Sequence, residues 1–310
     1  MERLFWDGRV SRDGDEVSTQ VVVPDGLGDP LAIQALHPIL DPAEMLGAPG
    51  DTRVDGSANE LAGRADLEVY AGLEARLTAI EAYVTLFRGA FGDEPITITN
   101  VVRAIAAFER ARYAATDTPW DRYLRGEVDA LSGAQKLGAI VFFSPNGCSG
   151  CHSGPLLTDE AFHNIGVPLL EPVDEGRFAL TDEPADRYAF RTPPLRNVAV
   201  APPFMHNGII GTLDDAIAHY GRPLDNARTY EPEHLPADLA ARHVSTGSHV
   251  DAMLGTLSSD LVTDEDALVL IQVSLSNLLA FMMALVDEVA LEGARQVPES
   301  VPSGLPVGGG

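Results

Sequence analysis

The chain has 310 residues, 45% of them apolar, which is enough to form the core of one large domain or of two ordinary ones. Its formal net charge of −25 excludes an electrostatic affinity for nucleic acid or anionic lipid, because both bind clustered Lys and Arg. It contains two cysteines, and both lie in one short motif, so the sequence also excludes a disulfide framework.

Helical patterns dominate the chain. Residues 65–91 and 97–114 carry apolar side chains at helical spacing, and Thr97 or Thr99 is a suitable N-cap for the second segment. Residues 17–23 form the one convincing strand-like run and predict one arm of a small hairpin. We therefore expect an all-α protein with a minor β-hairpin. The remaining predicted helices are 132–143, a segment from near Thr212, and about 264–288.

The last predicted helix contains a stretch long enough to be considered as a membrane span. Residues 267–286 are 20 uncharged and mostly apolar residues, and a span needs about 20. However, Gln272, Ser274 and Asn277 interrupt the stretch, and Thr263 followed by three acidic residues is typical of the start of an ordinary helix. We therefore expect a buried core helix and no membrane span.

Two domains and a tail are predicted from the order of these segments. The boundary between two lobes is expected near residues 115–130, after the second long helix, so we assign the domains to residues 1–120 and 121–290. Residues 291–310 are rich in Pro and Gly and are expected to be disordered.

Residues 148–152 read Cys-Ser-Gly-Cys-His, which is the C-x-x-C-H spacing. The two thiols lie on neighbouring faces of one helical turn, from which both can form thioethers to the vinyl groups of one porphyrin. His152 then directs its imidazole at the iron. We predict one covalently attached haem c, held by Cys148 and Cys151 and ligated by His152.

A C-x-x-C pair also occurs in redox dithiols and in zinc sites. A redox dithiol normally follows a strand in a β-α-β pattern, which this sequence lacks, and a zinc site needs further ligands, which only scattered histidines could supply. Haem is therefore the favoured interpretation. Because c-type haem is attached outside the cytoplasm, we expect a periplasmic or otherwise extracytoplasmic protein, although residues 1–10 contain no signal-peptide pattern.

Further motifs are spread over about residues 4–285. They are Leu4 to Arg9 (LFWDGR), Gln34-Ala35 with Glu44-Met45, Phe108-Glu109-Arg110, 121–126 (DRYLRG), 147–155 (GCSGCHSGP), 162–168 (FHNIGVP), 189–193 (AFRTP), 195–198 (LRNV) and 203–208 (PFMHNG). Together these motifs resemble the bacterial di-haem cytochrome c peroxidases, a family that includes the MauG-type enzymes.

The resemblance implies two cytochrome c-like helical domains, of which this chain would contain the C-terminal haem domain and a remnant of the N-terminal peroxidatic one. Family members reduce hydrogen peroxide at the N-terminal haem, and the C-terminal haem stores or relays electrons. MauG-type members instead oxidise a partner protein. The implied function is a c-type haem oxidoreductase that relays electrons for hydrogen peroxide reduction. Its implied partners are hydrogen peroxide and either an electron-donor protein, such as a small cytochrome or cupredoxin, or a protein substrate.

The resemblance also assigns the sixth ligand of the iron. In the family this ligand lies on the helix after the PFMHNG loop, where peroxidases usually have Met and MauG-type proteins have Tyr. Here the position is occupied by Tyr220, with Met205 and His206 as competing ligands. A phenolate oxygen stabilises ferric iron and lowers the reduction potential. The alternative is that Tyr220 is an ordinary half-buried aromatic residue.

Five further residues acquire roles through the same resemblance. Arg191 and Arg196 would pair bidentately with haem propionates, or else form ordinary surface ion pairs. Trp6 resembles the tryptophan that lies between the two haems of the family and serves as an electron or hole relay. Gln34 and Glu44 match the pair beside the peroxide-binding face of the N-terminal haem, where a carboxylate can move a proton between the peroxide oxygens.

The chain departs from the family pattern near its N-terminus. The family has a first C-x-x-C-H upstream of the LFWDGR segment, and that motif is absent here. We expect an N-terminally incomplete version of a longer di-haem protein. The other interpretation is a genuine mono-haem protein that transfers electrons without catalysis of its own. The expressed chain should carry one haem and show little peroxidase turnover. Of the calcium site known in the family, this chain would retain only the loop near Ala201 and Pro203, which could offer backbone carbonyls as ligands.

Overall fold

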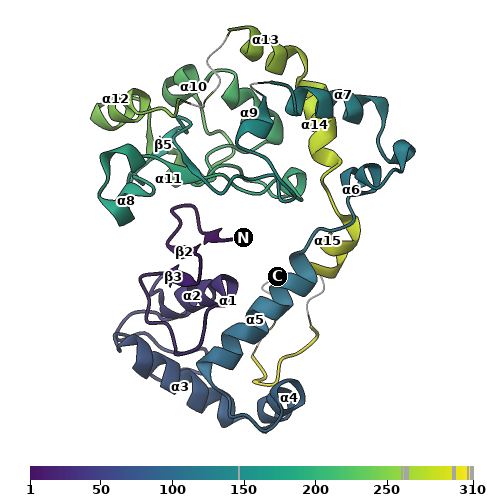
Figure 1. Cartoon of the computed structure of the whole chain (residues 1–310). Coiled ribbons are helices and arrows are strands. Elements are labelled where there is room, and N and C mark those ends of the chain that lie inside the picture. Colours follow the sequence, from purple (N-terminus) through teal and green to yellow (C-terminus); the bar gives the residue numbers. More distant parts are fainter. Residues whose placement is uncertain (146, 260, 262–264, 295–297, 306, 308–310) are drawn as a thin grey trace. The chain divides into compact units, whose positions relative to one another are not determined.

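The computed structural model of the chain describes all residues except 146, 260, 262–264, 295–297, 306 and 308–310. The fold is mostly helical with small sheets, as predicted (Figure 1). Two compact units are present: unit 1 comprises Met1–Leu4, Arg9–Ala114 and Val289–Gly310, and unit 2 comprises Phe5–Gly8 and Ala115–Glu288. The assignment of residues 1–120 and 121–290 to two cytochrome c-like domains, and the disorder of residues 291–310, stay predictions.

Unit 1 consists of a three-stranded antiparallel sheet, in the order β1-β2-β3, and several helices. Asp29 caps α1 by accepting a hydrogen bond from the N–H of Leu31, and its carboxylate also lies 2.7 Å from Arg110 of α5. This pairing links α1 to α5. The elements are β1 (Arg3–Leu4), β2 (Val10–Asp13), β3 (Glu16–Ser18), α1 (Pro30–Gln34), α2 (Leu36–Leu40), α3 (Asp66–Thr78), α4 (Glu81–Phe91) and α5 (Ile98–Tyr113).

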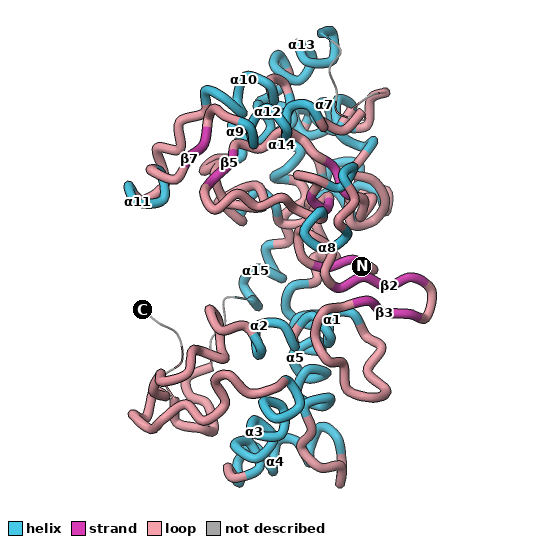
Figure 2. The backbone as a smooth tube through the Cα atoms, turned by 90° about the vertical axis from the view of Figure 1, so that its left-hand side faces the viewer, coloured by secondary structure: helices cyan, strands magenta, loops and turns pink. Residues whose placement is uncertain are grey.

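The predicted hairpin exists, formed by β2 and β3 (Figure 2), but the strand predicted at residues 17–23 is wrong over most of its length. The strand ends at Ser18, where its pairing with β2 ends. Further along, Tyr70 of α3 donates its hydroxyl to the carbonyl of Val22 (2.9 Å), and the N–H of Val22 donates to Asp66. Side chains of a helix therefore satisfy backbone groups that the sequence pattern assigns to a sheet.

Residues 65–91 form two helices, α3 and α4, where the periodicity predicts one continuous run. The break lies at Ile80, which has extended backbone geometry (φ −108°, ψ 103°) and allows α4 to pack back on α3. The next prediction, a helix over residues 97–114, is confirmed by α5, and Thr97 caps it by accepting from the N–H of Asn100. The break was not visible in the sequence, because Ile80 fits the helical spacing of its neighbours.

Unit 2 contains the C-x-x-C-H motif. The predicted helix at 132–143 is confirmed by α7, with Ser132 as N-cap, and the helix predicted from Thr212 is confirmed by α9. Two short antiparallel ladders, β4–β6 and β5–β7, were not predicted. The elements are α6 (Pro119–Leu124), α7 (Gly133–Phe142), β4 (Phe162–His163), β5 (Leu169–Leu170), α8 (Phe178–Thr181), β6 (Phe190–Arg191), α9 (Leu213–Tyr220), α10 (Pro223–Thr229), α11 (Ala237–Ala240), β7 (His243–Val244), α12 (Ser248–Gly255), α13 (Glu265–Val273) and α14 (Leu275–Met283).

The single helix predicted at about 264–288 is wrong, because the segment is divided into α13, α14 and α15 (Glu288–Ala294). Ser274 interrupts it with non-helical geometry, and serine favours helix ends over helix interiors. The break allows α13 to pack on α9 while α14 packs along α7. The expected N-cap, Thr263, lies outside the described residues. Among the described residues, none of the helices is both long enough and apolar enough to cross a membrane.

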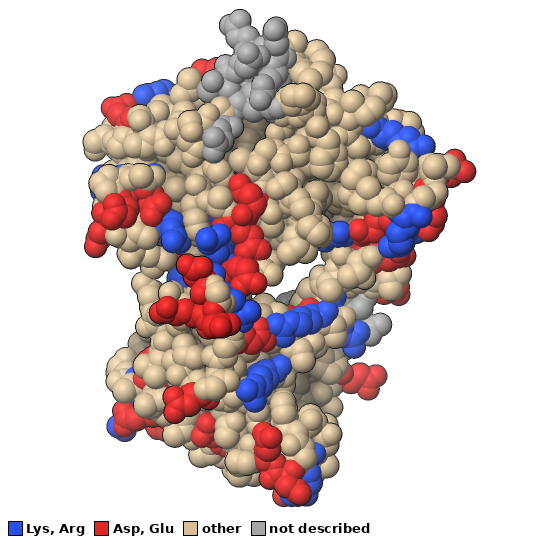
Figure 3. All heavy atoms as spheres, in the orientation of Figure 1, with Lys and Arg blue, Asp and Glu red and all other residues tan. Residues whose placement is uncertain are grey.

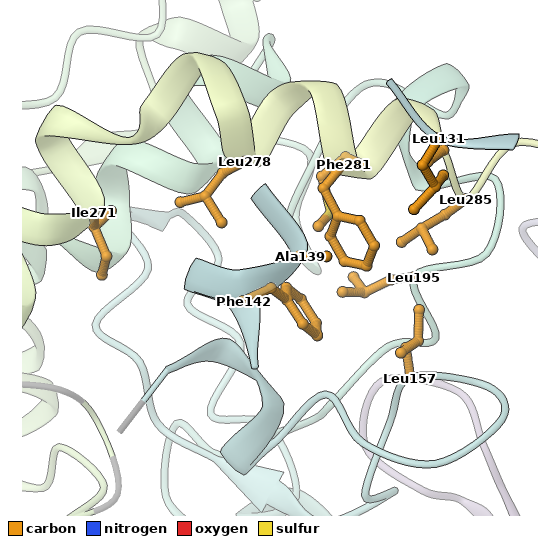
Figure 4. Close-up of a cluster of buried hydrophobic side chains, with 11 residues drawn as sticks. Leu131, Ala139, Phe142, Leu157, Leu195, Ile271, Leu278, Phe281 and Leu285 are labelled. Carbon is orange, nitrogen blue, oxygen red and sulfur yellow. The ribbon is translucent and has the colours of Figure 1, made fainter. Parts of the chain in front are cut away.

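The main core of unit 2 lies between α7 and α14. Phe281 of α14 is 0% exposed, and its ring centroid lies 5.1 Å from that of Phe142 (Figure 4). The Phe281 ring centroid also lies 5.2 Å from that of Trp120. The two helices approach closely at Gly138, where an added Cβ would lie 1.9 Å from the carbonyl oxygen of Asn277. This core holds the end of α7, from which the chain continues into the C-x-x-C-H motif.

Candidate haem site

The C-x-x-C-H motif forms a tight turn after α7. Cys148–Gly150 is a turn of 3-10 helix, and the N–H of His152 donates to the carbonyl of Cys148 (2.9 Å). Both cysteines are half-buried thiols, and neither is in a disulfide. One turn therefore carries two thiols and an imidazole, which is the set of groups that covalent haem attachment requires.

His152 is held in one orientation by its own loop. The residue is 8% exposed, and its Nδ1 lies 3.0 Å from the carbonyl oxygen of Leu157. Since a carbonyl only accepts hydrogen bonds, Nδ1 carries the proton and Nε2 has the lone pair that an iron ligand needs. Burial lowers the pKa of His152 and so favours this neutral form. The side chain fits the predicted role of proximal ligand.

Tyr220 is the last residue of α9 and is half-buried. Burial raises the pKa of its phenol, and the neighbouring Cys148 and Cys151 contribute to the same rise. The Tyr220 phenol therefore lies close enough to both haem-attachment sulfurs to interact with them electrostatically. This location supports Tyr220 as the second ligand of the iron. Burial keeps the phenol protonated, and a bound metal ion would take the place of that proton.

The competing ligands Met205 and His206 have other neighbours. Met205 packs against a buried apolar cluster that includes Phe204. The ring of His206 is stacked on that of Phe190, with centroids 3.5 Å apart and planes 10° apart, and burial lowers the pKa of His206 to about 3. These contacts account for both side chains without iron, although the identity of the sixth ligand stays a prediction.

Trp6 and Arg191, two predicted site residues, lie together in unit 2. The guanidinium of Arg191 donates from Nε to the carbonyl of Phe5 (3.0 Å), and the backbone N–H of Arg191 donates to the carbonyl of Trp6 (2.7 Å). Trp6 is 37% exposed and its ring meets that of His206 edge to face, with centroids 6.5 Å apart. Arg191 thus anchors the Trp6 segment; its pairing with a haem propionate stays a prediction.

Arg196 forms a bidentate pair with Asp121 at distances of 2.7 and 2.8 Å. It also donates to the backbone carbonyls of Ala115 and Pro155. Burial by itself would raise the pKa of Asp121, but the hydrogen bonds and charge of Arg196, with hydrogen bonds from Thr118, lower it to about 2. Arg196 therefore ties the start of α6 to the loop that follows the haem motif.

Replacement of Asp121 by Asn is expected to destabilise the protein by about 2 kcal/mol at neutral pH, since the pKa is lowered from 3.8 to about 2. A carboxyl group whose pKa is depressed in the fold stabilises it above the pKa of the unfolded chain. The contribution is therefore full at about pH 5 and above, and is lost as the pH falls through about 2. Urea unfolding of wild type and variant over this range measures the difference.

Asp117→Asn is the matched control for that experiment. Asp117 forms an ion pair with Arg125, but both side chains are more than half exposed, so its loss should change stability by less than about 0.5 kcal/mol. Equal effects of the two substitutions would show that burial of the Asp121–Arg196 pair has no energetic consequence.

The structure adds two residues to the site that sequence reasoning missed. The side-chain ligand atoms of Cys151, Asp159 and His163 all lie within 4.8 Å of one another, and His163 Nε2 is 2.9 Å from Asp159. A closed structural zinc site has four ligands, whereas this group offers three candidate ligands, one of which is a cysteine. His163 belongs to the FHNIGVP motif, which was its only signal in the sequence.

The two residues predicted for peroxide chemistry lie in unit 1. Gln34 is half-buried at the end of α1, and Glu44 is exposed in the turn after α2. The backbone near Ala201 and Pro203, predicted to offer calcium ligands, lies in unit 2 and is exposed. The roles of all four residues stay predictions.

The helical fold, the two thiols and the oriented imidazole define a c-type haem protein, and comparison with known proteins identifies its family. The family model described as di-haem cytochrome c peroxidase matches residues 1–129. The methylamine utilization protein MauG of Methylorubrum extorquens is 34% identical over 219 residues, which are 70% of this chain and 56% of MauG. The cytochrome-c peroxidase IdrP1 of Denitromonas iodatirespirans is 31% identical over 268 residues, covering 71% of this chain and 70% of the peroxidase.

A solved structure supports the same relationship. A MauG-like protein associated with microbial copper homeostasis is similar to this chain with a TM-score of 0.61 and 25% identity, over 87% of this chain and 73% of the other. The chain belongs to the family of di-haem cytochrome c peroxidases and MauG proteins. The match spans 56% of the length of MauG from Methylorubrum extorquens. Membership of this family of c-type haem oxidoreductases does not favour the alternative interpretation, a mono-haem electron carrier without catalysis of its own.

Proposed function

We propose that this chain is a c-type haem oxidoreductase that relays electrons for the reduction of hydrogen peroxide. The observation that carries the proposal is the arrangement of unit 2. Nδ1 of His152 is fixed by the carbonyl of Leu157, next to two thiols, and the phenol of Tyr220 lies near both sulfurs. A bound haem would supply one-electron redox chemistry at this site.

The residues of the chain would each contribute a separate property. Cys148 and Cys151 would hold the porphyrin covalently, and the Leu157 carbonyl would keep His152 neutral and oriented. Tyr220 as an anionic ligand would stabilise the ferric state and lower the reduction potential. These properties suit electron relay at a low potential.

Trp6 is proposed as the relay residue toward the peroxide-reacting haem of the family arrangement. Its segment is anchored at two carbonyls by Arg191, and its ring adjoins His206, which is stacked on Phe190. A relay residue must keep a constant distance from its redox partners, and this anchoring supplies the rigidity. Gln34 and Glu44 are proposed, from the family resemblance, to act on peroxide at that second haem.

The proposed partners are hydrogen peroxide and an electron-donor protein or protein substrate, outside the cytoplasm where c-type haem is attached. The net charge of −25 favours a basic protein partner. On the face drawn in Figure 3, Lys and Arg side chains lie beside Asp and Glu side chains. The positive charges on this face are thus largely compensated locally.

Tyr220→Phe is expected to change the ferric absorption and electron paramagnetic resonance spectra of the haem-loaded chain and to raise its reduction potential, because the anionic ligand is lost. Tyr230→Phe is the control, since Tyr230 is another half-buried tyrosine of unit 2 and should leave both properties unchanged. Identical spectra for wild type and Tyr220→Phe would remove Tyr220 from the coordination sphere.

A further inference from the structure

His219, the neighbour of Tyr220 in α9, is fully buried and makes hydrogen bonds in two directions. Its Nε2 lies 2.9 Å from the carbonyl oxygen of Ile165, and its Nδ1 lies 3.3 Å from Nδ2 of Asn226. A carbonyl only accepts, so Nε2 carries the proton and donates to Ile165. Nδ1 is then the acceptor for the amide N–H of Asn226. One imidazole therefore connects α9 to the FHNIGVP loop and to α10.

The acceptor of this bridge is itself held in place. On one side of Ile165, the side-chain amide of Asn164 donates to the carbonyl of Met253 in α12 (2.8 Å). On the other side, the N–H of Gly166 donates to the side-chain oxygen of Asn164 (3.0 Å). Asn164 and Asn226 are both buried, at 3% and 7% exposure. The hydrogen bond from His219 therefore ends on a rigid part of unit 2.

The C-terminal end of α9 depends on such contacts. The helix has eight residues, and isolated helices of this length are not stable in water. Thr212 caps its first turn, whereas His219 and the following Gly221 and Arg222 determine how it ends. Successive helical side chains project about 100° apart, so the direction in which His219 is fixed also sets the direction of Tyr220. The two ring centroids are 6.0 Å apart.

We propose that His219 is a positioning residue that holds the Tyr220 phenol at the iron, through its hydrogen bonds to Ile165 and Asn226. The inference rests on the proposed function, in which Tyr220 is an axial ligand. It assigns no catalytic step to His219. Without the bridge, the last turn of α9 has freedom to rotate, and Tyr220 leaves the iron for part of the time.

The test is ferric electron paramagnetic resonance of the full chain with haem attached. His219→Leu fills a similar volume with an apolar side chain and removes both hydrogen bonds. This variant should raise the ratio of haem whose iron lacks the Tyr220 ligand to haem whose iron has it by about tenfold or more. That factor corresponds to the free energy of one buried hydrogen bond. The signal of Tyr220→Phe defines haem without that ligand. His219→Gln places an amide N–H near the position of Nε2 and should restore most of the wild-type signal.

Two further variants decide between positioning and general destabilisation. Leu36→Ala creates a cavity in the core of unit 1, away from the His219 bridge, and should lower the unfolding temperature without changing the haem signal. An equal spectral change in Leu36→Ala and His219→Leu overturns the inference. If His219→Leu fails to take up haem, Asn226→Ala, which removes one of the two bonds, should show a smaller shift in the same direction; no shift overturns it.

The outcomes also separate this inference from the proposed function. A wild-type spectrum for Tyr220→Phe contradicts the ligand assignment on which both depend. A changed spectrum for Tyr220→Phe together with a wild-type spectrum for His219→Leu leaves the ligand in place and contradicts only the role of His219.

Discussion

Replacement of both Cys148 and Cys151 by Ser is expected to abolish covalent haem attachment in the chain expressed under conditions that mature c-type cytochromes. The reason is chemical, because thioether bonds to the porphyrin vinyl groups require thiols, and the chain contains no cysteine outside this motif. Each single substitution should leave one thioether and shift the absorption of the alkaline pyridine complex. Haem staining after denaturing electrophoresis and the intact mass measure the loss.

Ser149→Ala is the control for the cysteine variants. Ser149 lies between the cysteines in the same turn but carries no group needed for attachment, so this variant should retain a full complement of haem. Haem that survives denaturation in the double cysteine variant would contradict the assignment of residues 148–152 as the attachment site.

Phe281→Ala is expected to lower the free energy of unfolding by about 3 to 5 kcal/mol. The side chain is 0% exposed and packs against Trp120 and Phe142, so its removal leaves a cavity between α7 and α14 that the two helices cannot close. They already meet in backbone contact at Gly138. Urea or thermal unfolding followed by far-ultraviolet circular dichroism measures the effect, which should also lower haem occupancy because α7 leads into the haem motif.

Leu124→Ala serves as the control for the core prediction. Leu124 lies in the same unit but is 63% exposed, and surface substitutions of this kind change stability by about 0.5 kcal/mol or less. A loss below about 1 kcal/mol for Phe281→Ala would mean that the α7–α14 interface rearranges to fill the cavity, in conflict with the close packing at Gly138.

Comparison of sequence and structure shows which features are local. The helix starts at Ser132 and Thr212 were predicted because an N-cap hydroxyl binds an N–H group three residues further along the same helix. The break at Ile80 was not predicted, because it depends on where α3 and α4 pack. The break at Ser274 was missed as well, although serine favours helix ends over helix interiors. The same difference applies to Val22 of the predicted strand at residues 17–23, whose backbone N–H and carbonyl pair with side chains of α3.

The sequence by itself determined the chemistry of the site. The spacing of Cys148, Cys151 and His152 brings two thiols and an imidazole into one turn, and this requires no distant part of the chain. The flanking motifs placed the chain in its family, as the comparisons show. Both results depend on residues that are close together in the chain or that match a family pattern directly.

Only the tertiary structure decided which distant residues support that chemistry. Arg196 is paired with Asp121, 75 residues away, and His219 with Ile165, 54 residues away. No local pattern encodes such pairs, because a buried polar group takes its partner from whichever segment the fold brings beside it. The haem motif, with His152 held by its own loop, is thus a property of a short sequence, while the contacts of Arg196 and His219 are properties of the folded unit.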